Sequence, residues 1–331
     1  MAEYAVEMHN ISKHFPLVLA NDDVTFTVQQ SEIHALVGEN GAGKSTLMNI
    51  LYGLLRADSG TIAVSGKTVR FVGPGDAIAK GIGMVHQHFM LIPPLTVAEN
   101  VVLGQEPSKK GFVDTAKANQ IVQNLSDQYG LKVDPTAKVE TLSVGIEQRI
   151  EIIKVLYRGA EILILDEPTA VLTPQEVDEL FEILRALKDQ GKTIIFITHK
   201  LQEVMAVADT VTVMRRGKVV GTVPIADTTR QEIATMMVGR QVLFRVERTR
   251  AEPGEIVLTV KDLSALDNKA LPALRVISFS VREGEILGIA GVEGNGQSEL
   301  VEVLTGLRKA QSGTVELNAT RAPPPIETFR N

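Results

Sequence analysis

The chain contains no cysteine, and this absence excludes several kinds of chemistry. With no thiol among its 331 residues, it can form no disulfide bond, thiolate metal site or cysteine nucleophile. Basic residues are not in excess either, because the formal net charge is −6. A general nucleic-acid-binding surface needs a basic excess or a concentrated basic face. We therefore expect no nucleic-acid partner.

Long apolar runs are also missing. No stretch approaches the roughly 18 residues that a membrane-spanning helix requires. The start, MAEYAVEMHN, has neither the basic segment nor the apolar segment of a signal peptide. We expect a cytosolic chain, for which any role at a membrane comes through a partner.

The sequence does contain short, β-branched apolar runs. They alternate with longer amphipathic stretches, a pattern typical of buried parallel strands that alternate with helices. The predicted strands are 33–38, 81–87, 161–167, 192–199 and 210–217. The chain is long enough for one large core and a second domain. The pattern therefore predicts an α/β fold.

The sequence predicts where one helix begins and where it ends. In the stretch 173–191, Thr173 can cap the N-terminus, with Pro174 at the first helical position and Glu176 completing a capping box. Apolar residues follow at helical spacing, and Gly191 ends the helix.

Between residues 89 and 158 the composition changes. Three helices are expected there, at 95–104, 115–130 and 145–159, with no strand among them. We interpret this segment as a helical insertion in the α/β domain. Further along, 224–254 predicts a short helix followed by a linker, which we place at 241–254.

A long internal repeat divides the chain. SEIHALVGENGAGKSTLMNILYG (31–53) aligns without a gap with GEILGIAGVEGNGQSELVEVLTG (284–306), and the similarity continues on both sides. Copies about 250 residues apart indicate a duplicated domain rather than a solenoid. The second copy stops soon after its glycine-rich loop. We expect a fragment, with one domain at 1–240 and the first part of a second at 255–331.

The first copy of the repeat carries a phosphate-binding motif. GENGAGKS fits G-x-x-x-x-G-K-[ST] between a predicted strand and a predicted helix. Backbone N–H groups there converge on phosphate oxygens at a helix N-terminus. The candidate nucleotide-binding residues are Gly38, Glu39, Asn40, Gly41, Ala42, Gly43, Lys44, Ser45 and Thr46.

Two residues of this motif have individual roles. Lys44 adds a charge for the β- and γ-phosphates, and the Ser45 hydroxyl can ligate Mg²⁺. The expected cofactors are therefore ATP and Mg²⁺. The alternative is a glycine-rich turn that only joins strand to helix.

Acidic residues follow a later predicted strand. In ILILDEP, Asp166 would hold the magnesium ion and Glu167 would polarise the attacking water. An Asp-Glu-Pro sequence can also form a simple turn with a helix cap. His199 ends the next predicted strand, where it could reach the γ-phosphate or have a structural role.

Four motifs together resemble one family. GENGAGKST, LSVG (142–145), LILDEPTA (163–170) and ITHK (197–200) occur in the order and spacing of the ATP-binding cassette (ABC) ATPases. The resemblance covers 4–240, and the second copy resembles the first third of another cassette. It implies a P-loop NTPase fold with a helical subdomain insertion.

The resemblance also implies roles for particular residues. Phe15 would stack on adenine, although a place in the core is equally plausible. Gln87 would touch the magnesium ion or the water and link the core to the helical insertion. Ser143 and Gly145 would contact the γ-phosphate bound by the opposite cassette, and His199 matches the switch histidine.

Two motifs depart from the family pattern. The usual LSGGQ signature is LSVGI here, with Val144 and Ile146 as replacements. The usual S-A-L-D loop is AVLT, with Thr173 in the place of the aspartate. The second departure puts in doubt any coupling between sites that relies on this aspartate.

The tandem arrangement resembles the double-cassette ATPases of bacterial ribose, galactose and nucleoside importers. Within that group, the sequence of this chain is most similar to the nucleoside type. This resemblance implies a peripheral protein on the cytoplasmic face of the cell membrane. It would dock on membrane permease subunits beside Gln87, and an extracytoplasmic solute-binding protein would deliver the solute. Its partner cassette would lie in cis or in another chain.

An importer is not the only function that these motifs allow. Soluble tandem cassettes act in translation or DNA repair, but the first type usually has a long charged linker and the second has cysteine-rich zinc modules. A non-hydrolysing regulator is the third possibility, and Glu167 and Lys44 oppose it. In the second loop, Gln297 replaces the lysine, so we expect one working site and one slow, mainly structural site. The alternative is that Gln297 reflects drift in a second domain kept only for its shape, which also predicts a weak second site.

Overall fold

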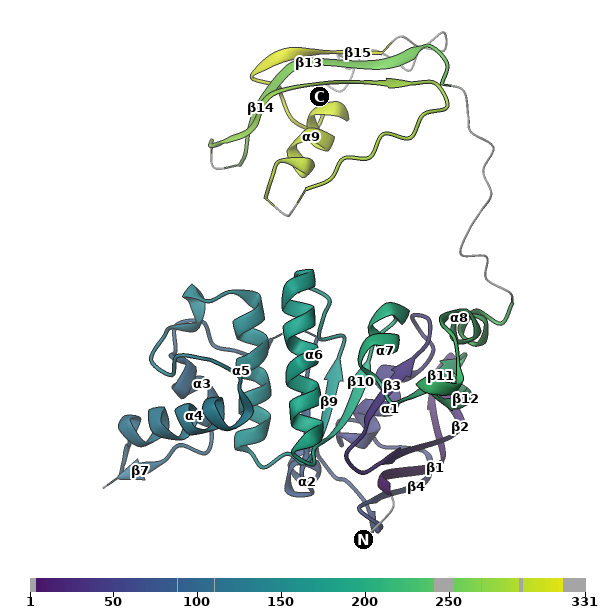
Figure 1. Cartoon of the computed structure of the whole chain (residues 1–331), viewed down its shortest axis with the longest axis vertical. Coiled ribbons are helices and arrows are strands. Elements are labelled where there is room, and N and C mark those ends of the chain that lie inside the picture. The colour runs from purple at the N-terminus through teal and green to yellow at the C-terminus, as the bar shows by residue number, and fades with distance from the viewer. Residues whose placement is uncertain are drawn as a thin grey trace. The chain divides into compact units, whose positions relative to one another are not determined.

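The computed structural model describes residues 4–87, 89–109, 111–240, 253–268, 270–291 and 294–317. The chain divides into two compact units, Met1–Phe244 and Arg245–Asn331, and each is described by itself (Figure 1). Among the described residues, no helix is both long and apolar enough to cross a membrane.

A six-stranded sheet forms the centre of the first unit, in the order β12-β11-β3-β10-β9-β6. Its strands are β3 (Ile33–Val37), β6 (Ile82–Val85), β9 (Ile162–Asp166), β10 (Thr193–Ile197), β11 (Thr210–Arg215) and β12 (Lys218–Pro224). All neighbours pair in parallel except β12, which is antiparallel to β11. The five strands expected from the sequence are confirmed. Because parallel strands are covered on both faces, β3, β6 and β10 are fully buried.

A second, antiparallel sheet has the order β2-β1-β4-β5. Its strands are β1 (Tyr4–Phe15), β2 (Val18–Gln29), β4 (Ser59–Val64) and β5 (Lys67–Val69). The helix α1 (Lys44–Leu51) shares a core with both sheets, since Leu47 and Met48 belong to the same buried cluster as Phe26 of β2 and Ile195 of β10. The short helix α2 (Pro74–Ala79) adds Ala77 to this cluster. This core fixes where α1 begins.

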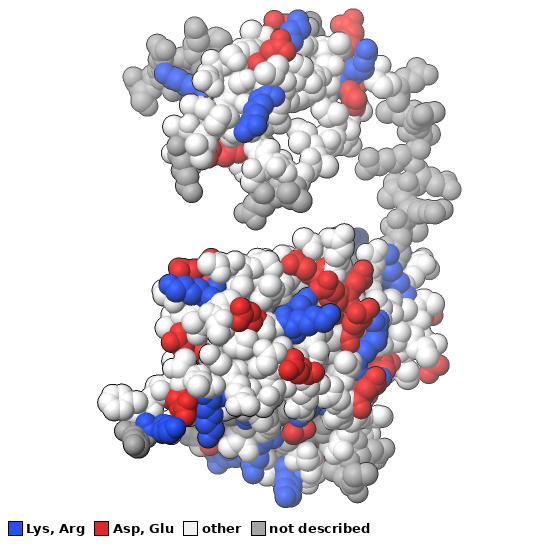
Figure 2. All heavy atoms as spheres, turned by 60° about the vertical axis from the view of Figure 1, so that its left-hand side comes forward, with Lys and Arg blue, Asp and Glu red and all other residues white. Residues whose placement is uncertain are grey.

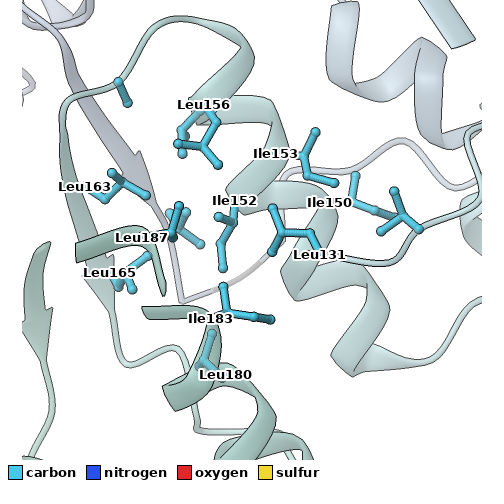
Figure 3. Packing of buried hydrophobic residues seen from close by; sticks show 14 of the residues in the cluster. Leu131, Ile150, Ile152, Ile153, Leu156, Leu163, Leu165, Leu180, Ile183 and Leu187 are labelled. Atoms are coloured by element: carbon cyan, nitrogen blue, oxygen red, sulfur yellow. The ribbon is translucent and has the colours of Figure 1, made fainter. Parts of the chain in front are cut away.

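The helices of the insertion pack together on one side of the six-stranded sheet. They are α3 (Val97–Val102), α4 (Thr115–Tyr129) and α5 (Val144–Tyr157), with a 3-10 turn at Val139–Thr141. Figure 3 shows Ile152 of α5 near Leu163 of β9 and Leu187 of α6 (Pro174–Asp189). The three helices expected from the sequence are confirmed.

The expectation that the insertion contains no strand was wrong. The strands β7 (Ser108–Lys109) and β8 (Phe112–Val113) form a small antiparallel hairpin. Gly111 supports the tight turn with its positive φ of 85°. Strands of two residues are too short to show the alternation of apolar and polar residues by which strands are recognised.

The start of α6 is as predicted from the sequence. Thr173 is its N-cap, Pro174 lies in its first turn, and the backbone N–H of Thr173 donates to Oε2 of Glu176 at 2.9 Å. The last helices of the first unit are α7 (Leu201–Val207) and α8 (Arg230–Val238), which pack on β3 and β11. A 3-10 turn at Ile225–Asp227 precedes α8. The expected short helix is α8, whereas 241–252 of the expected linker lie outside the described residues.

Side chains of both charge signs lie on the surface of the first unit. On the face shown in Figure 2, acidic and basic side chains are interspersed. Some of them pair between helices, as Arg149 of α5 does with Glu179 of α6. Others pair within a helix, as Lys154 does with Glu151 at 3.6 Å.

The strand order of the second unit is like that of part of the first. Its sheet has the order β14-β13-β15, with β13 (Ile256–Leu266), β14 (Pro272–Arg282) and β15 (Ser312–Leu317). The helix α9 (Gln297–Leu304) packs Leu300 and Val303 on this sheet. β14, β13 and β15 correspond to β2, β1 and β4, and α9 has eight residues, as α1 has.

Candidate functional site

The glycine-rich loop lies between β3 and α1 and is held there by β2. Gly43 is the N-cap of α1 with a φ of 100°, in the left-handed region. A Cβ atom on Gly43 would lie only 2.2 Å from the carbonyl oxygen of Ala20. Both observations exclude any other residue at this position without a shift of the backbone. The loop is thus clamped against the neighbouring strand.

An open cleft of about 620 Å³ lies beside this loop. Its lining residues are Phe15, Val18, Ala20, Asn40, Gly41, Ala42, Gly43, Lys44, Ser45, Thr46, Gln87, Asp166 and Glu167. The structure therefore brings most of the candidate residues together from four separate parts of the sequence. Phe15 is 42% exposed, which places it at the rim of the cleft rather than in the core.

Two lining residues were missed by the sequence analysis. Val18 and Ala20 belong to β2, just after the turn that follows Phe15. They carry no polar group and no motif, so only their place near Phe15 in the sequence could have suggested them. They make the wall beside Phe15 apolar.

Lys44 is buried and bonds to its own loop. Its Nζ donates to the carbonyl oxygen of Gly38 at 2.8 Å and to that of Glu39 at 3.1 Å. Burial lowers the pKa of Lys44, and the nearby Glu167 and Asp166 carboxylates oppose this effect. Gly38 and Glu39 are not among the residues that line the cleft, and they contact Lys44 through backbone carbonyls.

The two acidic residues lie where β9 ends. Burial raises the pKa of Asp166, as does the adjacent Glu167 carboxylate, while His86 and Lys44 lower it. Glu167 has a positive φ of 46°, and its backbone N–H donates to the carbonyl oxygen of Ile197 at 3.0 Å. A non-glycine residue in this conformation is uncommon, and such strain is often found at functional sites.

His199 contacts Glu167, which lines the cleft. Its Nδ1 lies 2.9 Å from Oε1 of Glu167, and half of the histidine side chain is exposed. The two residues come from different strands, because His199 follows β10 and Glu167 follows β9. The parallel pairing of β9 with β10 sets them side by side.

Ser143 and Gly145 are not among the residues that line this cleft. Ser143 is the N-cap of α5, and Gly145 lies in its first turn. A Cβ atom on Gly145 would lie 2.4 Å from Oε1 of Glu176, so α5 begins against the start of α6. The backbone N–H of Thr173 lowers the pKa of Glu176 most, and that of Gly145 contributes.

The residues of the cleft fit a magnesium ion bound together with phosphate. Ser45, Gln87 and Asp166 offer a hydroxyl, an amide oxygen and a carboxylate in the same cleft. A cation there would offset the burial that raises the pKa of Asp166. The described residues contain no group of three or more His, Cys, Asp and Glu side chains that could hold a metal ion. Mg²⁺ needs no such group when one or two carboxylates and substrate phosphates supply its ligands.

Comparison with known proteins gives the family. The profile of the family described as ABC transporter matches residues 21–170 and 274–330. The chain belongs to the ABC transporter family. A solved ATP-binding cassette of an ABC transporter, in its ADP conformation, matches with a TM-score of 0.62 and 25% identity over 71% of this chain and 95% of that one. The expected P-loop fold of an ABC ATPase is confirmed.

Two curated relatives are similar over almost the whole chain. The guanosine import ATP-binding protein NupO of Bacillus subtilis is 54% identical over 96% of this chain and 62% of its own length. The glucose import ATP-binding protein TsgD13 of Haloferax volcanii is 52% identical over 95% of this chain and 62% of its own length. The chain thus spans less than two thirds of these relatives.

Proposed function

We propose that this chain is an ATP-binding and ATP-hydrolysing subunit of an ABC importer for nucleosides or simple sugars. The observation that carries this proposal is the cleft in which Lys44, Asp166 and Glu167 lie beside the glycine-rich loop. The names of the relatives describe import of guanosine and of glucose, and from these names we propose import as the role of this chain. Because these solutes differ in chemistry, the proposal extends only to the two classes of solute.

Nucleotide binding follows from the geometry of the loop. The start of α1 lines the cleft, and a helix N-terminus favours an anion through its dipole and its unpaired backbone N–H groups. Lys44 exchanges the carbonyls of Gly38 and Glu39 for the β- and γ-phosphates. Phe15 at the rim stacks on the base. Ser45, Gln87 and Asp166 would hold Mg²⁺, which neutralises charge on the phosphates when it is bound.

Hydrolysis is assigned to Glu167 with His199 beside it. The carboxylate of Glu167 accepts a proton from the attacking water as the water approaches the γ-phosphate. His199 orients this carboxylate through the contact between Nδ1 and Oε1. We also assign to His199 a contact with the γ-phosphate.

A second cassette completes the site. Ser143 and Gly145 lie outside the cleft of their own unit, so we assign them to the γ-phosphate bound by another cassette, in cis or in another chain. Residues 255–331 form the first part of a second cassette. Support comes from the clamp on the loop: a Cβ atom on Gly296 would lie 2.6 Å from the carbonyl oxygen of Ala273, the counterpart of Gly43 and Ala20.

The proposed partners are membrane permease subunits at the cytoplasmic face, with an extracytoplasmic binding protein as an indirect partner. We place the permease contact at 88–104, beside Gln87. A cavity of about 150 Å³ lies there, and its lining includes His86, Met90 and, from α5, Glu151 and Lys154. Its volume is comparable to that of a single side chain of a partner.

The test of the proposal is Glu167→Gln. This change should retain ATP binding and lower turnover about 10²–10⁴-fold, which is the usual contribution of general acid–base catalysis. The matched control is Glu182→Gln, an exposed glutamate of α6. Turnover of Glu167→Gln within a few-fold of the parent would contradict the assignment.

The dependence of turnover on protein concentration tests whether two chains share a site. If Ser143 and Gly145 of one chain close the site of another, turnover per chain should rise with protein concentration and then level off. Rapid turnover that does not depend on concentration would refute a site shared between chains.

A further inference from the structure

Behind Glu167 and His199 lies a buried carboxylate that no motif predicts. Glu203 of α7 is only 7% exposed. Its Oε1 accepts a hydrogen bond from Oγ1 of Thr169 at 2.7 Å, and its Oε2 accepts one from Oγ1 of Thr198 at 3.0 Å. Both threonines are buried as well. One carboxylate therefore joins two loops.

These two loops carry the residues that we assign to hydrolysis. Thr169 follows Glu167 by two positions, and Thr198 directly precedes His199. The loops also meet where the backbone N–H of Glu167 donates to Ile197 and where His199 contacts Glu167. The carboxylate of Glu203 forms one side-chain hydrogen bond with each of the two loops.

Both hydroxyls donate to Glu203, so each of its two oxygens acts as an acceptor. Oγ1 of Thr198 accepts from the backbone N–H of Lys200 at 3.0 Å, and Oγ1 of Thr169 accepts from Nζ of Lys200 at 3.3 Å. Each hydroxyl has one hydrogen, which is then free to point at Glu203. An ionised carboxylate accepts both, whereas a glutamine amide offers one acceptor and one donor. Nζ of Lys200 lies 3.1 Å from Oε1 of Glu203 and balances its charge.

We propose that Glu203 is a positioning residue for ATP hydrolysis, which holds Glu167 and His199 at the cleft through Thr169 and Thr198. This inference rests on the proposed function, in which Glu167 and His199 act in hydrolysis. Glu203 is not among the residues that line the cleft. It should therefore affect turnover and leave nucleotide binding unchanged.

The first experiment measures amide hydrogen exchange of the 331-residue chain. In Glu203→Gln, the segments 166–170 and 197–200 should exchange at least several-fold faster than in the parent. The control is Val204→Ala, which opens a cavity at a fully buried neighbour on α7 and leaves the threonine hydrogen bonds in place. The proposal is overturned if these segments exchange at the parent rate, or if both variants speed exchange equally everywhere.

The second experiment measures ATPase kinetics at a protein concentration where turnover has levelled off. Glu203→Gln should lower kcat about 10- to 100-fold, since small displacements of catalytic groups have effects of this size. The KM for ATP should stay within about twofold. The double variant Thr169→Val/Thr198→Val should show the same loss, and adding Glu203→Gln to it should cause little more.

These outcomes separate the inference from the proposed function. If Glu167→Gln keeps its turnover, the proposed function fails first. If Glu167→Gln loses turnover while Glu203→Gln keeps its kcat, or if Glu203→Gln raises only the KM, Glu203 does not position the two residues. Should Glu203→Gln fail to fold, Thr169→Val and Thr198→Val test the same links one at a time.

Discussion

Nζ of Lys44 donates a hydrogen bond of 2.8 Å to the carbonyl oxygen of Gly38, six residues earlier in the same loop. The cation is thus kept at the head of α1 by the backbone that surrounds it. Burial lowers its pKa, so the site makes its charge costly in the absence of an anion. A phosphate in the cleft would relieve this cost.

Replacing Lys44 with methionine should separate affinity from stability. ATP affinity should fall about tenfold or more, because hydrogen bonds to charged groups contribute about 1.5–3 kcal/mol. The free energy of unfolding should stay the same or rise, since a buried charge is removed. Titration calorimetry and denaturant unfolding measure the two effects, with exposed Lys80→Met as control. A large loss of stability would show that Lys44 mainly supports the fold.

Asp58 gives a pH-dependent contribution to stability. Nζ of Lys13 and the backbone N–H of His14 donate to its carboxylate at 2.8 and 2.7 Å, which joins β1 to the start of β4. The hydrogen bond from Lys13, followed by that from His14, lowers the pKa of Asp58 from 3.8 to about 2. A lowered pKa means that the unfolded chain binds the proton first as the pH falls. This stabilisation is therefore complete above pH 3.8 and is lost as the pH falls toward 2.

Asp58→Asn should accordingly lower stability at pH 7 and make little difference near pH 2. The effect at pH 7 should be small, because Asp58 is open to solvent and exposed ion pairs contribute little. Denaturant unfolding of both proteins across this pH range measures it. Asp178→Asn, at an exposed position of α6, serves as control. A difference that grows as the pH falls would contradict the assigned sign.

The clamp on each loop can be tested with a matched pair of glycines. Gly41 and Gly43 both have a positive φ, 81° and 100°, but only a Cβ atom on Gly43 would meet other atoms within 4 Å. Gly41→Ala should thus add only backbone strain, about 1–2 kcal/mol. Gly43→Ala should add overpacking of about 1–3 kcal/mol to that.

The same pair recurs in the second unit. Gly294 has nothing within 4 Å of its ideal Cβ position, whereas Gly296 would meet the carbonyl oxygen of Ala273. Gly296→Ala should therefore destabilise the second unit more than Gly294→Ala does. Thermal unfolding of the four variants measures both differences. Equal effects within either pair would mean that the loop yields easily and is not clamped.

The sequence predicted those features that depend on neighbours along the chain. The strands β9 and β10 are short apolar runs because both of their faces are buried, and the capping box at Thr173 uses residues three positions apart. The glycine-rich loop is likewise one continuous motif. By contrast, the bond of Glu203 to Thr169 joins residues 34 positions apart, which meet only after β9 and β10 have paired. No local pattern records such a contact.

Met90 tests the proposed permease contact. Its backbone is held to α5, where its N–H donates to Glu151 and its carbonyl oxygen accepts from Lys154, and 61% of the residue is exposed. Met90→Asp should therefore lower solute uptake several-fold and leave ATP affinity unchanged. Uptake and ATPase activity would be measured together in membranes, with exposed Val72→Asp as control. A fall in affinity as large as the fall in uptake would assign this stretch to the ATP site.

The last prediction concerns the residue that replaces the lysine in the second loop. Gln297 begins α9 as Lys44 begins α1, and a Cβ atom on Gly291 would lie 2.0 Å from Nε2 of Gln297. The glutamine side chain thus reaches back to the start of its own loop, as Lys44 does to Gly38.

The two loops thus differ in charge, and they also differ in what precedes them, because 286–290 are exposed and form no strand, whereas β3 is fully buried. In a Lys44→Met background, where the first site is weakened, Gln297→Lys should tighten the remaining ATP binding several-fold, because it restores a cation for the phosphates. Gln297→Met has similar length and no charge, so it should not tighten binding. Equilibrium binding of a fluorescent ATP analogue can measure all three proteins. If Gln297→Lys binds no more tightly than Gln297→Met, the second loop lacks more than a lysine. In a complete transporter, restored lysine should also change the coupling of hydrolysis to uptake if the asymmetry is used, whereas unchanged coupling would favour drift.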